Sequence, residues 1–390
     1  MKTANFSYLV GQPPAAINSA DPRWRAALPL DRRRAAAGPL PAGHAFAYGD
    51  YFTAASQFLL HADMAVVVSA ATILTGRNVS PADIDHIAVH LAKHGAFYHP
   101  ARVVVTVDSD RLSLVLNVAV SEPGRTAVTS EYAALERLNG QCRGFLPRVF
   151  GRGTGRVGAF DVALFAAEWL EEFCEFHLGH TPEGTLQWQL WGEAGERWTL
   201  TAAQVAVLYR QAACILTACF NPLTFESISG WHHAAGDFVL KPGPDQAAVR
   251  LITVRRYAPL FTVDTDEPPE LEKLLDGLAA FFIDMSLRMR IDRLDGVGEL
   301  AWAPDSVISP VWEGFGAGLA QMAAYHELPP ELGAMVGQYL AAHPPRELKR
   351  LGRRIAARYP SASGERRLIE HHLGQHLDAL ADIMLYAPIG

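Results

Sequence analysis

Two runs of β-branched residues separated by a short polar segment constrain the fold of this 390-residue chain most strongly. The first run is ARVVVTV at Ala101–Val107, and the second is LSLVLNVAV at Leu112–Val120. β-Branched side chains favour strands, and the intervening DSDR is typical of a turn. The sequence therefore predicts an antiparallel hairpin here. A second hairpin is expected after it, with its turn at Gly151–Gly158.

Helical patterns accompany these strands. Ser80–Gly95 starts with a serine, a proline and an acidic residue in capping positions and then shows apolar residues at helical spacing, so we expect a helix. TSEYAALERLN at Thr129–Asn139 predicts a short amphipathic helix. TAAQVAVLYRQAACILTACF, which begins at Thr201, predicts a long buried helix with a threonine cap. Helices are expected to dominate the remainder of the chain.

The order of these elements predicts an α+β protein with a β-rich half followed by a mainly helical half. We expect an extended N-terminal arm over residues 1–49, a first lobe over 50–170 and a helical lobe over 171–390 with a β-hairpin near 237–257. The arginine run at 32–34 is interpreted as solvated surface.

Composition excludes several classes of protein. The 34 basic and 41 acidic residues give a formal net charge of −7, which disfavours a nucleic-acid partner. The most apolar segment, Met64–Leu74, is shorter than the 20 or so residues that a bilayer requires, and the N-terminus lacks the pattern of a signal peptide. We therefore expect a soluble cytoplasmic protein that does not enter a membrane.

Four cysteines show no C-x-x-C spacing, which argues against a zinc ribbon or a disulfide framework. Cys214 and Cys219 lie in a buried helical pattern and are interpreted as thiols of the core. A reducing compartment is the simplest expectation.

Gly153, Gly155 and Gly158 form a literal G-x-G-x-x-G. A dinucleotide-binding fingerprint requires a strand before the glycines and a helix after them, so that the helix N-terminus meets a pyrophosphate. A β-rich run follows here, and we interpret the glycines as residues that permit positive φ in a hairpin loop.

The order of motifs resembles the bilobal protein-kinase-like fold, in particular its aminoglycoside and choline phosphotransferase branch. LVLNVAV is similar to the strand that normally carries the phosphate-binding lysine, and this places Asn117 at the position of that lysine. TSEYAALERL is similar to the helix that follows, with Glu131 as its paired glutamate. VALFAAEWLEEF resembles the strand and hinge that hold adenine, with Glu168 near the hinge.

The segment SGWHHAAGDF falls where that family has its catalytic loop. The resemblance places His232 at the catalytic aspartate, Asp237 at the metal-binding asparagine and Thr253 at the second metal-binding aspartate. Phosphoryl transfer depends on charge neutralisation by the lysine and the metal ligands, and most of these groups are replaced here. His233 lies beside His232 as a further candidate.

Two hypotheses remain open for this segment. In the first, the site has lost kinase chemistry and the chain is a pseudokinase-like binding or regulatory protein with a small-molecule or protein partner. In the second, the chain is an atypical phosphotransferase or nucleotidyltransferase: His232 is a general base and Asp237 binds one Mg²⁺, with ATP as the cofactor that the resemblance implies.

Several other residues are candidates for ligand binding. Arg255 or Arg256 could replace the cationic charge of the missing lysine. HGAFYHPARV, with His99, stands in place of a flexible glycine-rich loop. Glu175, His177 and His180 follow the hinge and could serve a site there, although a structural role is the simpler interpretation.

Two further kinds of site were weighed. His372 and His376 have the i, i+4 spacing of metal ligands, but we favour the interpretation that they lie on an exposed polar helix face. A serine hydrolase is disfavoured because the chain lacks G-x-S-x-G.

Overall fold

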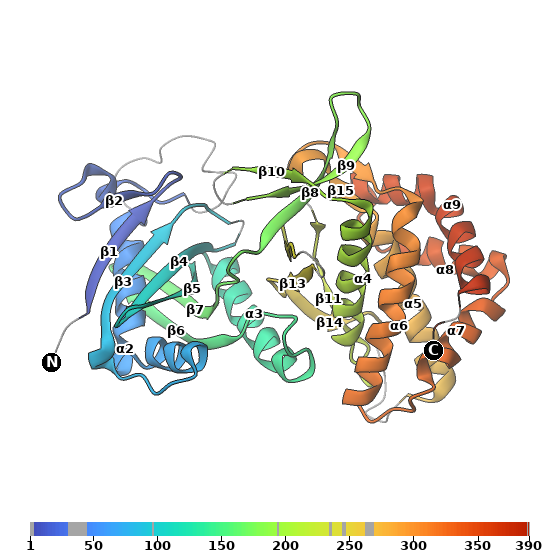
Figure 1. Cartoon of the computed structure of the whole chain (residues 1–390), viewed down its shortest axis with the longest axis horizontal. Helices are drawn as coiled ribbons and strands as arrows, with labels where there is room; N and C mark the ends of the chain where they lie inside the picture. Colours follow the sequence, from blue (N-terminus) through green and yellow to red (C-terminus); the bar gives the residue numbers. More distant parts are fainter. Residues whose placement is uncertain are drawn as a thin grey trace. The chain divides into compact units, whose positions relative to one another are not determined.

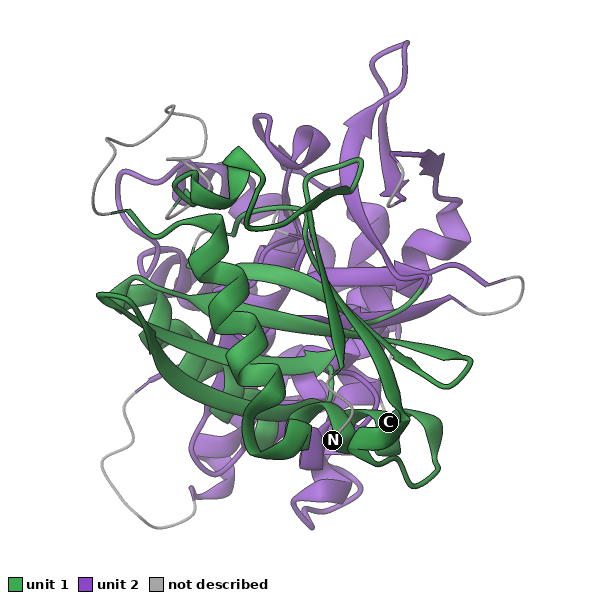
Figure 2. Cartoon of the chain, turned by 90° about the vertical axis from the view of Figure 1, so that its left-hand side faces the viewer, with its two compact units in different colours: residues 1–137, 147–171 green, residues 138–146, 172–390 purple. Residues whose placement is uncertain are grey.

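A computed structural model describes residues 4–29, 45–95, 97–192, 195–233, 236–243, 247–261, 269–387 and 389. The fold is of the mixed α+β class and contains a large mixed sheet as well as helices. The chain divides into two units, which Figure 2 shows in different colours. Unit 1 comprises residues 1–137 and 147–171, and unit 2 comprises residues 138–146 and 172–390.

Unit 1 contains a seven-stranded sheet with the order β2-β1-β3-β4-β5-β7-β6 (Figure 1). All neighbouring strands are antiparallel except β1 and β3, which are parallel. The strands are β1 Asn5–Val10, β2 Ala15–Ile17, β3 Ile84–Leu91, β4 His99–Val107, β5 Asp110–Ala119, β6 Val149–Val157 and β7 Phe160–Glu168. Both predicted hairpins form, as β4 with β5 and as β6 with β7. The second turns at Gly158 and Ala159, whereas residues 151–157, which we expected in the turn, lie in β6.

Two helices cover opposite faces of this sheet. Helix α2, Tyr48–Thr75, packs on one face of the sheet, where a Cβ added at Gly151 or Gly153 of β6 would contact its side chains. On the other face, the guanidinium of Arg152 lies 5.3 Å from the ring centroid of Tyr132 in helix α3, Glu122–Gln141. Helix α3 contains the predicted Thr129–Asn139 helix but begins seven residues earlier, at Glu122.

Helix α2 is long and apolar enough to cross a membrane by length and composition alone. Core helices of globular units pass the same test. Its backbone departs from helical geometry between His61 and Met64, and each of the two parts is shorter than a bilayer requires. Tyr51, Phe52 and Val67 are fully buried within unit 1.

The predicted Ser80–Gly95 helix is wrong. The capping residues are used by a short 3₁₀ helix, Pro81–Asp83, in which the Ser80 N–H and hydroxyl donate to the Asp83 carboxylate. The chain then enters β3, where a register irregularity between Ile84 and His86 shifts the alternation of buried side chains. A bulge of this kind makes a strand resemble a helical pattern over one turn.

The N-terminal segment also differs from the expected arm. Residues 5–10 and 15–17 form strands β1 and β2, and β1 pairs with β3 over its whole length. A 3₁₀ helix at Pro22–Arg25 follows. These elements belong to unit 1, and the arginine run at 32–34 lies outside the described residues.

The glycine fingerprint does not form a dinucleotide loop. Only Gly158 occupies the turn, with φ of 59°, whereas Gly153 and Gly155 lie inside β6. A Cβ at Gly153 would come within 2.8 Å of the Phe58 ring of α2. Our interpretation of all three as loop glycines is therefore wrong, since Gly153 instead permits close approach of the helix to the sheet.

Unit 2 contains a five-stranded sheet, two small strand pairs and a group of helices (Figure 1). The sheet order is β10-β9-β8-β12-β13, and the pairs are β11 with β14 and β15 with β16. The predicted hairpin near 237–257 is the antiparallel pair of β12 and β13. The strands are β8 Cys174–His180, β9 Leu186–Trp191, β10 Arg197–Thr199, β11 Glu226–Ser229, β12 Phe238–Lys241, β13 Ala248–Leu251, β14 Arg256–Pro259, β15 Ile291–Arg293 and β16 Leu300–Trp302.

The helices of unit 2 follow the expected pattern after Leu200. Helix α4 begins after Thr201, whose hydroxyl accepts a hydrogen bond from the Gln204 N–H, as the capping signal predicted. Short 3₁₀ helices lie at Leu294–Gly296 and Asp305–Val307. The α-helices are α4 Ala202–Ala218, α5 Leu271–Met289, α6 Ile308–Tyr325, α7 Leu332–Ala342, α8 Pro345–Ala356 and α9 Gly364–Tyr386.

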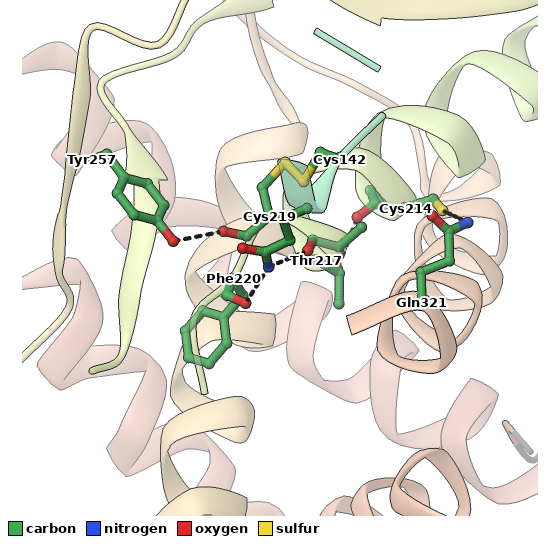
Figure 3. Close-up of a disulfide and its surroundings, with 10 residues drawn as sticks. Cys142, Cys214, Thr217, Cys219, Phe220, Tyr257 and Gln321 are labelled. Carbon is green, nitrogen blue, oxygen red and sulfur yellow. Dashed lines mark hydrogen bonds between the residues drawn. A yellow bond between two sulfur atoms is a disulfide. The ribbon is translucent and has the colours of Figure 1, made fainter. Parts of the chain in front are cut away.

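A disulfide joins Cys142 to Cys219 within unit 2 (Figure 3). It attaches the segment after α3 to the end of α4, and the Tyr257 hydroxyl donates to the Cys219 carbonyl oxygen at 3.0 Å. The expectation that Cys219 is a free thiol is therefore wrong, because two cysteines 77 positions apart meet only in the folded chain. Cys214 is a buried free thiol, as predicted, and burial raises its pKa to about 11.

We predict that Gly153→Ala lowers the free energy of unfolding by about 1–3 kcal/mol, because the added methyl group displaces the buried Phe58 ring. Gly155→Ala is the matched control, since its Cβ would meet Val162 only at an ordinary 3.7 Å. That variant should be neutral or more stable by about 0.5 kcal/mol. Urea denaturation of both variants measures the difference, and equal effects would contradict this account of β6.

Candidate functional site

The segment between β11 and β12 is the centre of the candidate site in unit 2. It turns at Gly230 and Gly236, which have φ of 78° and 67°. The backbone of β14 returns beside β11, and this brings Arg255 next to the end of the segment. We call Trp231, His232, His233, Asp237 and Arg255 the loop cluster.

Asp237 is held in a bidentate ion pair. Its carboxylate is 1% exposed, and Arg255 donates from Nη1 to Oδ2 at 2.6 Å and from Nη2 to Oδ1. The backbone N–H of His232 donates to Oδ2 at 2.8 Å. Arg255 is 31% exposed, so one partner of the pair reaches solvent and the other does not.

These contacts do not fit the predicted magnesium role of Asp237. Both carboxylate oxygens already accept hydrogen bonds from a guanidinium, and a cation at the same oxygens would be repelled by Arg255. Within the described part of the chain, no three His, Cys, Asp or Glu side chains are grouped to hold a metal ion. The arrangement is that of a buried salt bridge between the two ends of the β12–β13 hairpin.

His233 lies in an aromatic environment. The centroids of the Phe176, Tyr209, Trp231 and Phe238 rings lie between 5.3 and 5.8 Å from its own. The side chain is 1% exposed, and its ring nitrogens make no hydrogen bond of standard geometry, although the Met289 backbone lies near. Burial lowers its pKa to about 3. His233 is therefore a neutral packing residue that a substrate cannot reach.

His232 remains accessible. Its Nδ1 lies 3.8 Å from Oε1 of Glu365, and its side chain is 36% exposed. Burial lowers the pKa of His232, Glu365 opposes this effect, and nearby arginines reinforce it. The imidazole is thus neutral at neutral pH, which is the form that a general base requires.

Two residues near His232 were not found by sequence reasoning. Glu365 lies in the first turn of α9, and Arg288 lies near the end of α5. The guanidinium of Arg288 lies 5.7 Å from the Trp231 ring centroid and 5.3 Å from that of Tyr359. No local pattern marks these residues, since they approach His232 only through the packing of distant helices.

Four predicted ligand-binding residues lie in unit 1. Asn117 is buried on β5, and Glu131 is buried on α3, where it accepts a hydrogen bond from the Tyr98 hydroxyl at 2.7 Å. His99 is buried, and its Nδ1 lies 3.2 Å from Nδ1 of His94. Glu168 ends β7 and accepts from the Arg148 N–H at 3.3 Å.

The sixth candidate for ligand binding, Arg256, is exposed at the start of β14 in unit 2. It therefore lies one residue beyond Arg255 without sharing its ion pair.

Of the candidates Glu175, His177 and His180, the structure places the first two next to each other and the third apart from them. His177 is buried, with Nε2 3.7 Å from Glu175 Oε2, whereas His180 is exposed at the end of β8. Asp292 was missed by sequence reasoning. It is buried nearby, accepts the N–H groups of Leu178 and Arg293, and has its pKa raised to about 6 by burial.

The C-terminal histidines are not an exposed pair. His372 stacks on Trp302, whereas His376 is 1% exposed, with Nδ1 3.3 Å from Nη1 of Arg290 and Nε2 3.0 Å from Ser286 Oγ. Arginine can only donate, so the proton of the neutral ring is on Nε2 and Ser286 is its acceptor. The Ser286 hydroxyl in turn donates to the Ile283 carbonyl oxygen, and it has no base to activate it.

No protein-family model matches the chain, and no curated protein is similar to it at a significant level. The functional conclusion therefore depends on the residues and contacts described above.

We predict an asymmetric effect of breaking the ion pair. Arg255→Ala should lower the free energy of unfolding by about 3–5 kcal/mol, because it leaves the Asp237 carboxylate buried without a counter-charge. Asp237→Asn should cost about 1–3 kcal/mol, since Arg255 can turn to solvent. Urea denaturation of both single variants and the double variant measures the coupling. Equal single effects with no coupling would show that the pair does not order the loop.

We predict that His233 lowers stability in acid. Its folded-state pKa of about 3 lies below the ordinary value of 6.5, so only the unfolded chain binds this proton between those pH values. Stability is therefore lost as pH falls below about 6.5, by up to about 1.4 kcal/mol per pH unit for one proton. His233→Phe should remove this part of the slope. Denaturation curves at several pH values test this, and parallel curves for wild type and His233→Phe would contradict it.

Proposed function

We propose that this chain has a bilobal kinase-like fold without ordinary phosphoryl transfer and works as a pseudokinase-like binding or regulatory protein. Its partner would be a small molecule or another protein. Neither a nucleic acid nor a membrane is part of the proposal.

The order of elements supports the resemblance. In unit 1, β5 with Asn117 is followed by α3 with Glu131 and then by β6 and β7, as the resemblance implies. In unit 2, the segment with His232 and Asp237 is followed by the β12–β13 hairpin and then by Thr253. Asn117, His232 and Thr253 replace groups on which phosphoryl transfer depends.

The observation that carries the proposal is the ion pair of Asp237 with Arg255. A kinase requires a carboxylate or amide here that is free to bind a metal ion. In this chain the carboxylate is saturated by the guanidinium and by the His232 N–H. These contacts hold His232, Asp237 and Arg255 together by protein groups alone, which suits a binding protein.

The competing function is an atypical phosphotransferase or nucleotidyltransferase. The accessible, neutral imidazole of His232 beside Glu365 favours it. Glu365 could orient the ring and stabilise its protonated form, while the ring accepts a proton from a substrate hydroxyl. Because Asp237 does not fit a metal ion, this alternative has no step through Mg²⁺.

Thermal melting and phosphate release test the proposal. We expect Mg²⁺ or Mn²⁺ alone to leave the melting temperature unchanged, and we expect no phosphate release from ATP at kinase-like rates. A ligand at 100 times its dissociation constant would add about 2.7 kcal/mol of stability, so binding would be visible as a shift. Phosphate release that is lost in Asp237→Ala would overturn the proposal. Metal-independent turnover lost in His232→Ala would establish the alternative.

A further inference from the structure

Helix α8 presents a row of arginines on one side. Arg346, Arg350 and Arg354 are four residues apart, so their side chains lie one above another on the helix, and all three are exposed. Arg353 on the same helix and Arg358, two residues past its end, are also exposed. We call these five residues the arginine stripe.

The arginine stripe has no carboxylate partners within the described part of the chain. Nearby cations do have them, since Lys349 pairs with Asp378 and Arg366 pairs with Glu370. Residues 343–367 contain eight basic and two acidic residues, a formal charge of +6 in a chain of net charge −7. Like charges one turn apart destabilise a helix, so this concentration of positive charge is not explained by stability.

The stripe is held in a fixed orientation. Leu348 and Ile355 on the opposite side of α8 are buried. Gly352 lies so close to α9 that a Cβ would come within 2.9 Å of Leu373 and Leu377. Rotation of α8 about its axis would break this packing. The exposed side of the helix, with Arg346, Arg350 and Arg354, therefore faces solvent.

We infer that the arginine stripe docks an acidic segment of a partner protein, with Asp or Glu side chains along one side of two to three helical turns. Arg354 lies eight positions after Arg346, or about 12 Å along the helix axis, which matches such a segment. Guanidinium groups bind carboxylates in a bidentate manner, and this suits arginine better than lysine. The inference does not depend on the kinase-like resemblance.

Two other anionic partners fit less well. A membrane-surface helix inserts its apolar face between lipids, and the apolar side of α8 is buried in the protein. A nucleic acid would extend past the stripe, and outside residues 343–367 the sequence has 26 basic against 39 acidic residues, which disfavours such a contact. The short length of the stripe therefore favours a compact acidic partner.

Binding of a synthetic peptide tests the inference on the full chain. The probe is a fluorescent peptide with glutamates at every fourth position, and its anisotropy is followed at low salt. We expect saturable binding that Arg350→Glu with Arg354→Glu weakens on the order of tenfold or more. Arg111→Glu with Arg156→Glu is the control, because it makes the same change in net charge at exposed arginines of unit 1 and should change the dissociation constant less than about twofold.

Three other outcomes would overturn the inference. It fails if the double variant in α8 and the control double variant in unit 1 weaken binding equally, since net charge alone would then explain the result. It also fails if vesicles of phosphatidylcholine and phosphatidylserine, or duplex DNA, bind the chain more tightly than the peptide does and depend on the same arginines. Arg350→Gln with Arg354→Gln, together with a thermal melt of each variant, shows whether a loss of binding reflects misfolding. The inference also fails if a double variant at Arg350 and Arg354 melts normally and still binds the peptide as tightly as the wild type does.

Discussion

The burial of one carboxylate organises the loop cluster. Asp237 is almost fully removed from solvent, and a charged group in that position requires a counter-charge and hydrogen-bond donors. Arg255 and the His232 N–H supply both. The donors come from residues 232 and 255, so the pair joins the two ends of the β12–β13 hairpin.

The hydrogen bond between the His232 backbone and Asp237 also explains why the two adjacent histidines differ in exposure. Once the His232 backbone is tied to Asp237, the side chain of His232 points to the Glu365 side and remains accessible. That of His233 enters the aromatic environment of Phe176, Tyr209 and Phe238. One imidazole is thus available to a ligand, and its neighbour is part of the core.

The sequence predicted correctly those elements in which β-branched runs or apolar residues at helical spacing extend over many residues. The β4–β5 hairpin has two long β-branched runs, and α4 has both a threonine cap and a continuous apolar stripe. The pattern failed at β3, where a bulge mimics helical spacing, and at β1, whose short strand depends on pairing with β3. Sequence reasoning proposed His232, His233 and Asp237 as candidates, but the burial of His233 and the ion pair of Asp237 are tertiary features that it could not predict. Glu365 and Arg288 were missed because they lie far away along the chain.

By itself, the sequence determined the mixed α+β class, the main hairpins and the helical character after Leu200, because these depend on local propensity and periodicity. Only the tertiary structure decided which groups meet: Asp237 with Arg255, Cys142 with Cys219, and His376 with Arg290. Each of these pairs joins residues that are distant along the chain or on different elements. Their chemistry depends on burial and on a partner, and neither can be read from one segment alone.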